Sequence, residues 1–408
     1  MRPKALVYFL HNPMPPRSGA HRRCLRMLRG LREAGHHVTL ASSTLHSETE
    51  WRRDSVRALI DEGWADRVEI FSPGRWEQRA DALERRIRRR MHLGPRGLFA
   101  EVPCPLSLRV WFGALAARLR PDLLLVNYAW FDQLAPPETP ARKVIETHDL
   151  LTVNRVLRTE VESLLAAHAR GEPCPRLLDE RFMDHAHTAP APDELEVYDR
   201  YDDTIAISPA EETLLRAGLR HSRVCRIGVT EEPRPAANTR DGAFLLAAGP
   251  NPFNTQACLY FARKVWPLVR RACPSARAII VGGARLTDDT VGEGLEKAGF
   301  VPEAELARLY AAAPAAVSCV FAGTGQQVKV VEALAHGVPV VALRSRTLSP
   351  LLVAGATGEI ANDAAEMADH LARLFDDRAR RARLGAEARL RVAADSDANR
   401  ALPALFTR

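Results

Sequence analysis

GTGQQVKVVEALAHG occupies residues 323–337 and joins two apolar runs that are typical of buried strands. The run AAVSCVF at 315–321 precedes it, and VPVVAL at 338–343 follows it. The spacing of the stretch predicts a glycine loop and then a helix, QQVKVVEALAH, which ends at Gly337. A strand, a loop, a helix and a second strand form the repeating unit of a parallel sheet covered by helices. This stretch therefore predicts an α/β fold.

The start of the predicted helix has the features of an anion site. The N–H groups of Gly325, Gln326 and Gln327 would lack partners within the helix and would stand at the positive end of its dipole. Lys329 and Glu332 follow on the polar side of the helix. A cation and a carboxylate behind such a loop suit a nucleotide diphosphate with a ribose beside it. The alternative is an ordinary surface helix on which the two charges form an i, i+3 pair.

Length and composition indicate a two-domain protein without a membrane-spanning segment. The chain has 408 residues, more than one core of roughly 100–200 residues accommodates. No apolar run reaches about 18 residues, and the start MRPKALVYFLHNP is too short in its apolar part for a secretory signal. We therefore expect a cytoplasmic protein. The seven cysteines are scattered without metal-ligand spacing, so we expect neither disulfides nor a metal site.

Much of the net charge of +7 lies in one amphipathic segment, residues 76–96. Seven arginines stand between Arg79 and Arg96, against Asp81 and Glu84. One helical face carries the apolar residues Trp76, Leu83, Ile87 and Met91. The pattern predicts a solvated basic helix face, with peripheral contact to the inner face of a membrane or to a phosphorylated acceptor as the alternatives. Nucleic acid is not expected as a partner, because no aromatics are interleaved and no recognition motif accompanies the segment.

The chain divides into two stretches in which strand-like runs alternate with helical spacing. TEEPRPAANTRDG at 230–242 has no periodicity and separates them. Residues 151–200 show no regular pattern. The predicted strands are KALVYFL (4–10), HHVTLAS (36–42), RPDLLLVNYAW (120–130), ARKVIETHDL (141–150) and YDDTIAIS (201–208), then AFLLAAG (243–249), ARAIIVGG (276–283) and the two runs beside the opening stretch. The expected divisions are an N-terminal domain at 1–230, a linker at 231–242, a second domain at 243–380, and C-terminal helices at 381–408 that pack back toward the first domain.

Two segments of the second stretch carry a specific resemblance to a known family. LLAAGPNPFNTQACLYFARKVWPLVRRACPSARAIIVGG (245–283) matches the family's first strand, helix and second strand. GFVPEAELARLYAAAPAAVSCVFAGTGQQVKVVEALAHGVPVVA (299–342) matches its donor-site segment. The first domain is collinear with the family but looser, beginning with PRSGAHRRCLRMLRGLREAGHHVTL (16–40). On these residues the chain resembles the GT-B glycosyltransferases of the retaining family usually numbered four, also called group 1. The resemblance implies two doubly wound, Rossmann-like parallel-sheet domains that face a cleft, with the acceptor side in 1–230 and the nucleotide-sugar donor domain in 243–380.

The activity that the resemblance implies is transfer of a sugar, as in a hexosyltransferase, from a nucleotide-diphosphate sugar to a hydroxyl acceptor. It implies retention of anomeric configuration and neither a metal nor a cofactor. The acceptor would be a glycan, a glycolipid or another lipid-linked glycan, or a small molecule, as in polysaccharide biosynthesis. The alternatives are a catalytically inactive sugar-nucleotide-binding subunit and a sugar-nucleotide epimerase on the same fold.

The resemblance also implies roles for individual residues. Lys329 would stabilise the leaving pyrophosphate, Glu332 would accept hydrogen bonds from the ribose, and His148 would act at the acceptor side. Further donor contacts would come from Gly19, Asn251, Asn254, Phe300, Val301, Gly323, Thr324, Gly325, Gln326 and Gln327. Turn chemistry is the alternative for the two asparagines and for Gly19. For His148 the alternative is a strand-end residue beside Asp149, which would cap the following helix.

One departure from the family pattern concerns the sugar. Many members carry a glutamate eight positions before the residue equivalent to Glu332, and this chain has Thr324 there. The usual paired glycines of the first loop are Gly19 and Ala20 here. The resemblance therefore implies a nucleotide-sugar site without implying which sugar it holds.

Overall fold

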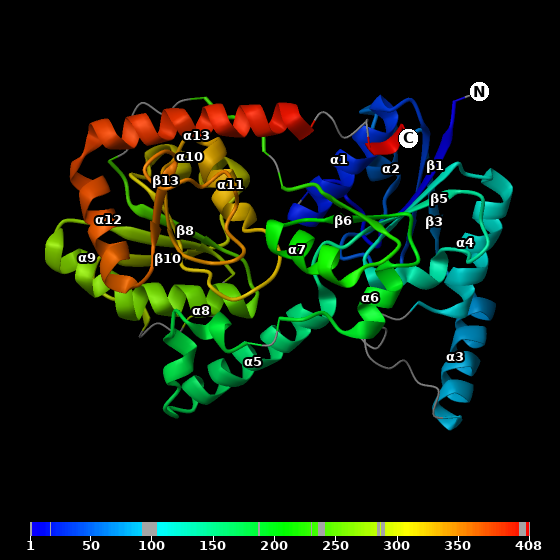
Figure 1. Ribbon diagram of the computed structural model, residues 1–408, viewed down its shortest axis with the longest axis horizontal. Coiled ribbons are helices and arrows are strands. Elements are labelled where there is room, and N and C mark those ends of the chain that lie inside the picture. The colour runs from blue at the N-terminus through cyan, green and yellow to red at the C-terminus, as the bar shows by residue number, and fades with distance from the viewer. Residues whose placement is uncertain are drawn as a thin grey trace. The chain divides into compact units, whose positions relative to one another are not determined.

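We obtained a computed structural model of the chain, which forms two compact units (Figure 1). It describes residues 2–16, 18–91, 104–186, 188–229, 231–235, 241–283, 286, 290–399 and 405–407. The first unit comprises Met1–Thr152, Ala189–Gly228 and Asn399–Arg408, and the second comprises Val153–Thr188 and Val229–Ala398. Residues 153–188, which we assigned to the first domain from the sequence, thus count with the second unit.

A seven-stranded parallel sheet forms the centre of the first unit, with the strand order β3-β2-β1-β4-β5-β6-β7. In register, Ala5 of β1 lies opposite Val38 of β2 and Leu123 of β4. The central strands are buried over nearly their whole length, because helices cover both faces of such a sheet. The strands are β1 (Lys4–Tyr8), β2 (His37–Ser43), β3 (Arg67–Phe71), β4 (Leu123–Asn127), β5 (Arg142–Glu146), β6 (Asp203–Ala206) and β7 (Arg223–Arg226).

Helices connect these strands in the order that a parallel sheet requires. Ser18 caps the first of them, since its side chain accepts a hydrogen bond from the N–H of His21. The chain leaves the first unit within α5, after Thr152. The helices are α1 (Gly19–Glu33), α2 (Arg53–Asp61), α3 (Arg75–Arg90), α4 (Leu106–Leu119), the 3-10 turn η2 (Ala129–Leu134), α5 (Leu151–Ala169), α6 (Pro192–Tyr198) and α7 (Pro209–Gly218).

The second unit is built on a six-stranded parallel sheet with the order β10-β9-β8-β11-β12-β13. Its core packs Leu245, Val340 and Ala342 of the sheet against Val330 and Leu334. The strands are β8 (Phe244–Ala248), β9 (Ala278–Gly282), β10 (Leu295–Gly299), β11 (Ala316–Ser318), β12 (Val340–Leu343) and β13 (Gly358–Ala361). The strand β11 is shorter than the run 315–321 predicted.

Helical segments link the strands of the second unit as well. They are the 3-10 turns η3 (Pro175–Leu178) and η4 (Phe182–Asp184), then α8 (Pro252–Tyr260), the π-helix η5 (Phe261–Val265), α9 (Trp266–Ala272), α10 (Glu303–Ala312), α11 (Val328–Ala335), α12 (Ala364–Asp376) and α13 (Arg378–Asn399). Helix α13 counts with the second unit except for Asn399. Beyond it, the carbonyl of Leu405 accepts a hydrogen bond from Arg142 in the first unit.

In each sheet the chain first adds strands on one side of the first strand and then adds them on the other side. In the first unit this switch point lies between β1 and β4, and in the second it lies between β8 and β11. Loops that leave neighbouring strands at such a point diverge, and ligands bind outside the carboxyl ends there. Each unit therefore has one candidate edge.

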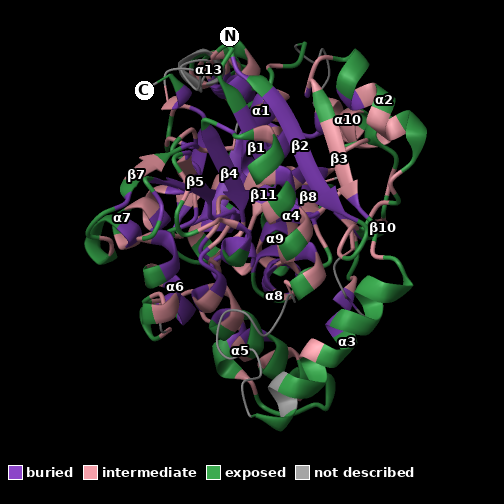
Figure 2. Cartoon of the chain, turned by 90° about the vertical axis from the view of Figure 1, so that its right-hand side faces the viewer, coloured by how far each residue is buried: buried purple, intermediate pink, exposed green. Residues whose placement is uncertain are grey.

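The predicted strands missed one class of element. β3, β7, β10 and β13 were not expected, and all four lie at the edges of their sheets. Figure 2 shows β1, β2 and β4 largely buried, whereas β3 is only partly so. An edge strand is covered on fewer sides, so its sequence lacks a continuous apolar run.

Candidate functional site

The GTG loop runs from Cys319 to Gln327, between β11 and α11. Helix α11 begins at Val328, two residues later than the sequence predicted, with Gln327 as its N-cap. The end of the helix is as predicted: Gly337 has a φ of 65°, and its N–H donates to the carbonyl of Leu334. The N–H of Val338 reaches the carbonyl of Ala333, which completes a Schellman motif.

Gln327 does not have the open N–H group that we predicted. That N–H donates to the carbonyl of Thr347 at 3.3 Å. Its side-chain amide donates to the carbonyl of Val320 and to the hydroxyl of Thr347, both at 2.9 Å, and accepts from the Ser318 hydroxyl at 2.7 Å. These bonds fix the base of the loop. Gln327 is therefore a brace rather than a free donor.

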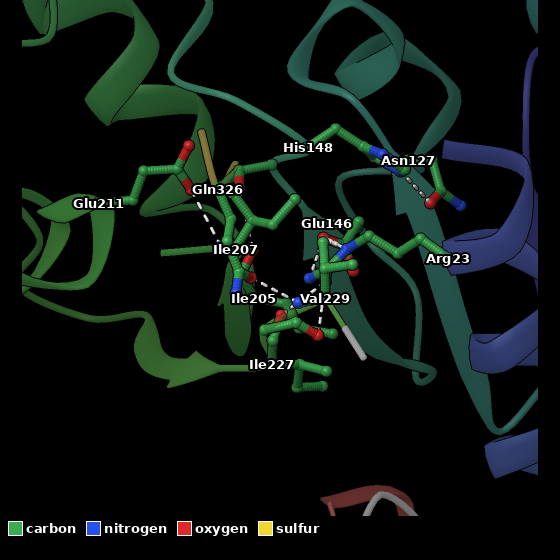
Figure 3. A network of polar contacts seen from close by, with 12 residues as sticks. Arg23, Asn127, Glu146, His148, Ile205, Ile207, Glu211, Ile227, Val229 and Gln326 are labelled. Atoms are coloured by element: carbon green, nitrogen blue, oxygen red, sulfur yellow. Dashed lines mark hydrogen bonds and ion pairs between the residues drawn. The ribbon is translucent and has the colours of Figure 1, made fainter. Parts of the chain in front are cut away.

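Gln326 also holds the loop through its side chain. The amide oxygen accepts from the N–H of Val229 at 2.5 Å, as Figure 3 shows, and the amide nitrogen donates to Ser349 at 3.1 Å. Gly323 adopts a φ of 131°, which only glycine reaches without strain. Thr324 is buried between the two half-buried glycines, Gly323 and Gly325. The loop is thus a tight turn that is held by the side-chain hydrogen bonds of Gln326 and Gln327.

Lys329 and Glu332 lie on one face of α11, as their spacing predicted. The Nζ atom of Lys329 is 2.7 Å from Oε2 of Glu332. The lysine side chain remains 43% exposed, and the glutamate side chain 16%. A half-exposed ammonium in the first turn after a glycine loop is able to contact an anion, while the carboxylate beside it is able to accept hydrogen bonds.

The loop after β8 carries the two predicted asparagines. Asn251 is the N-cap of α8, and its Oδ1 accepts from the N–H of Asn254 at 2.8 Å. The amide nitrogen of Asn254 lies so close to Gly249 that a Cβ there would approach it to 3.2 Å. The turn chemistry that we held open for Asn251 is therefore present. Because β8 and β11 are neighbours, this loop and the GTG loop leave adjacent strands.

Phe300 follows β10 and presents an aromatic ring at this edge. Its side chain is 78% exposed. A Cβ on Gly283 would meet the ring at 2.7 Å and the Pro250 side chain at 3.0 Å, so the ring sits over the ends of β9 and β8. Val301, next in the chain, packs against the core of the second unit. An exposed ring above glycine backbone is suited to stacking against a flat group.

In the first unit, the carboxyl edge holds an ion pair that the sequence analysis missed. Arg23 of α1 contacts Glu146 at the end of β5 through Nε and Nη2, each at 2.7 Å, and both side chains are buried. The same guanidinium donates to the carbonyl of Ile227 at 2.5 Å. Burial raises the pKa of Glu146, although Arg23 and the N–H of His148 act in the opposite direction. The signal available in the sequence was that Arg23 shares the apolar side of α1 with Met27 and Leu31, but its partner lies 123 residues away.

His148 stands two residues beyond β5 and has a left-handed φ of 57°. Its Nε2 lies 2.8 Å from Oδ1 of Asn127, at the end of β4 (Figure 3). The amide nitrogen of Asn127 donates to the carbonyl of Tyr8 at 2.7 Å, which fixes the orientation of the amide because a carbonyl accepts only. In the neutral imidazole Nε2 therefore carries the hydrogen, and Nδ1 holds a lone pair. Burial, with smaller contributions from Arg23 and His11, lowers the pKa of His148 well below its usual range.

Tyr128 is a second strained residue beside His148. It follows β4 with a φ of 68°, and its ring stacks on the His148 ring at a centroid distance of 4.1 Å. Left-handed backbone at a non-glycine residue costs about 1–2 kcal/mol. Two such residues in contact at adjacent strand ends indicate a site whose geometry is held by its surroundings.

Two further residues that the sequence singled out lie near this edge. Gly19 is the first residue of α1, after the cap Ser18, and no acidic residue lies in the first turn. That position leaves a helix N-terminus without a nearby negative charge on its own helix. At the start of α5, beside Asp149, Glu194 accepts from the N–H groups of Leu151 and Thr152 at 2.7 and 2.9 Å.

Glu211 completes the buried charges of this edge. It lies in the first turn of α7. Its carboxylate accepts from the N–H of Ile207 and from Thr147, each at 3.0 Å. Burial, and next the charge of Asp149, raises the pKa of Glu211 well above its ordinary value. Among the described residues, no group of three or more His, Cys, Asp or Glu side chains is arranged to hold a metal ion.

Comparisons with known proteins bear on the second unit in particular. Residues 243–377 match the family described as Glycosyl transferases group 1, and this match contains the GTG loop, Lys329 and Phe300. No curated protein matches the chain by sequence.

Solved structures extend the likeness to both units. Sucrose-phosphate synthase from Thermosynechococcus elongatus is 17% identical with a TM-score of 0.61, over 98% of this chain and 96% of that one. Anabaena Alr3699/HepE in complex with UDP-glucose is 15% identical with a TM-score of 0.60, over 99% of each chain. WaaG, a glycosyltransferase involved in lipopolysaccharide biosynthesis, is 12% identical with a TM-score of 0.57, over 99% and 98%. At these identities the likeness shows a shared fold, which confirms the predicted pair of parallel-sheet domains.

Proposed function

Because the second unit carries a group 1 glycosyltransferase segment on a GT-B fold, we propose that the chain is a glycosyltransferase that uses a nucleoside-diphosphate sugar. The reaction proposed is transfer to a hydroxyl acceptor with retention of anomeric configuration and without a metal. The observation that carries the proposal is the position of the family match. It covers the segment in which the GTG loop and Lys329 follow β11 and Phe300 follows β10 of the same sheet.

Stabilisation of the leaving diphosphate is the role of Lys329. Negative charge grows on the diphosphate as the bond to the sugar breaks, and a fixed cation lowers the energy of that state. The half-exposed ammonium of Lys329 is available for this contact, whereas the N–H of Gln327 is already bonded. The backbone of the loop at 323–325 supplies the remaining contacts. Glu332, 2.7 Å from the lysine, both orients it and accepts from the ribose hydroxyls.

The nucleobase is placed on the ring of Phe300. The ring is exposed and lies over Gly283, where any side chain would collide with it. Val301 anchors the segment in the core, so the ring is held from below. The first donor to test is UDP-glucose, with which Anabaena HepE was crystallised.

His148 serves the acceptor side of the reaction. Its lowered pKa keeps the imidazole neutral, and Asn127 holds the hydrogen on Nε2, so Nδ1 is the acceptor atom. That lone pair is suited to a hydroxyl of a glycan, a glycolipid or a small-molecule acceptor. Asn127 is then a positioning residue, because it acts through the imidazole.

Thr324 replaces the glutamate that many members of the family carry at this position. It is buried in the loop and offers no carboxylate to the sugar. This feature supports a second candidate, a sugar-nucleotide-binding subunit without turnover.

The decisive experiment incubates the chain with a panel of nucleoside-diphosphate sugars and hydroxyl acceptors, with a chelator present. We expect release of free nucleoside diphosphate that depends on the acceptor, and a product whose anomeric configuration matches the donor by NMR. Donor binding without release for every acceptor would support the inactive subunit and overturn the transferase. Conversion of the donor to its epimer would identify an epimerase instead.

A further inference from the structure

Helix α3 of the first unit exposes a stripe of large apolar side chains. Trp76, Leu83 and Ile87 are 75%, 58% and 48% exposed, and Met91, which continues the last turn, is 61% exposed. The N–H of Met91 bonds to the carbonyl of Ile87, so the helical turn persists there. Spacings of seven, four and four residues place all four on one side of the helix. We call these residues the α3 stripe. Figure 2 shows that most of α3 is exposed.

Two acids of α3 contact the start of α4. Asp81 is buried and accepts from the N–H of Ser107 at 3.0 Å and from its hydroxyl at 2.6 Å. Glu84 accepts from the N–H of Leu106 at 2.9 Å and pairs with Arg109. The start of α4 thus fixes which side of α3 faces the protein. The side chains of the α3 stripe nevertheless stay largely exposed.

Arginines flank the α3 stripe. Arg79, Arg86 and Arg90 each lie three positions after a stripe residue and are exposed. The guanidinium carbon of Arg79 lies 5.2 Å from the Trp76 ring centroid. Asp81 and Glu84 are engaged with the start of α4. Glu77, in the first turn, is the acid that remains exposed among the described side chains of α3.

We propose that the α3 stripe and its flanking arginines dock the protein on the surface of an anionic lipid bilayer. Apolar side chains that remain in water have no stabilising role in the folded chain, but they gain by entering the boundary between headgroups and acyl chains. The arginines are complementary to anionic headgroups. Nucleic acid would contact the arginines but not Leu83, Ile87 and Met91. A bilayer would contact both the charged and the apolar side chains. No described helix is long and apolar enough to span a membrane, so the contact is peripheral. This inference does not depend on the proposed transferase activity.

Co-sedimentation of the full chain with vesicles tests the proposal. We expect binding to vesicles that contain phosphatidylglycerol, at least about tenfold stronger than to pure phosphatidylcholine and weaker at high salt. A triple variant, Trp76→Ala, Leu83→Ala and Ile87→Ala, should lose at least about tenfold of that binding. A second variant, Arg79→Gln with Arg86→Gln, should lose most of the salt dependence.

The matched control removes exposed apolar side chains from other helices, with Val156→Ala in α5 and Leu390→Ala in α13. Its binding should equal that of the unaltered chain, and circular dichroism should show all variants folded. Equal binding by the triple variant and the unaltered chain would overturn the proposal, as would a failure of the unaltered chain to bind anionic vesicles. Binding to a DNA duplex as tight as to anionic vesicles, insensitive to the triple variant, would identify a polyanion patch instead.

Discussion

The carboxyl edges of the two sheets differ in what their charged side chains contact. In the first unit Arg23 and Glu146 are buried against each other and against backbone. In the second, Lys329 and Glu332 pair at the same distance but remain partly in water. A buried charge without its partner is strongly unfavourable, whereas a pair on a helix surface contributes only tenths of a kcal/mol. Burial therefore separates charges that hold the fold from charges that are available to a ligand.

The largest effect should follow from removing the buried cation. We expect Arg23→Met to lower the free energy of unfolding by about 3–5 kcal/mol, since Glu146 is left as an unpaired buried carboxylate. Denaturant unfolding measures this change. Arg158→Met, which breaks an exposed i, i+4 pair with Glu162, serves as the control and should change stability by less than about 1 kcal/mol. Similar losses in the two variants would contradict the distinction drawn between the edges.

The loss of stability in Arg23→Met should depend on pH, because the pKa of Glu146 is shifted. Burial raises the folded-state pKa of this carboxyl, and loss of Arg23 raises it further. A raised pKa means stability that is fully present below the unfolded pKa, about 4.3, and is lost as pH rises through the folded pKa. The stability gap between Arg23→Met and the unaltered chain should therefore widen from pH 5 to pH 8, at constant salt. A gap independent of pH would show that packing, and not the carboxylate, dominates.

At the exposed edge we expect a loss of activity with little loss of stability. Lys329→Ala should lower turnover at least about tenfold, equivalent to about 1.4 kcal/mol of transition-state stabilisation. Its free energy of unfolding should fall by only about 0.2–0.5 kcal/mol. Arg308→Ala removes a comparable exposed i, i+3 pair, with Glu305, and should retain full activity. Unchanged turnover in Lys329→Ala would remove this lysine from the mechanism.

The smallest effect on turnover should come from Asn127, a buried residue that contacts His148. Asn127→Ala removes the acceptor for Nε2 of His148 and should lower turnover about fivefold, as expected for one hydrogen bond of about 1 kcal/mol. A double-mutant cycle separates positioning from general damage. In a His148→Ala background the same change should have no further effect on turnover. Additive losses would show that Asn127 does not act through the imidazole.

Sequence patterns predicted the central strands better than the edge strands, because the two kinds of strand differ in burial. LVY in β1 is buried from every side and reads as an apolar run. RVEIF in β3 is only partly buried along most of its length and carries two charges. The signal that identifies a strand from sequence is thus the burial of both faces, which edge strands lack.

The residues of the candidate site likewise differ in whether their partners are near or far along the chain. Lys329 and Glu332 were found because their partnership is local, three residues apart on one helix. The pairs Arg23 with Glu146 and Asn127 with His148 are separated by 123 and 21 residues, so no local period reveals them. The start of α11 was misplaced because Gln327 bonds to Thr347, 20 residues further along the chain. The donor and acceptor roles of the predicted residues stay predictions.

By itself, the sequence determined the α/β class, the central strands, the glycine that ends α11 and the spacing of its polar face. These features depend on the chemistry of residues that are close along the chain. Only the tertiary structure decided which charges are buried, which nitrogen of His148 holds the hydrogen and which apolar residues of α3 remain in water. The physical reason is that desolvation and pairing depend on what the folded chain brings together in space, and this is set by contacts between distant segments.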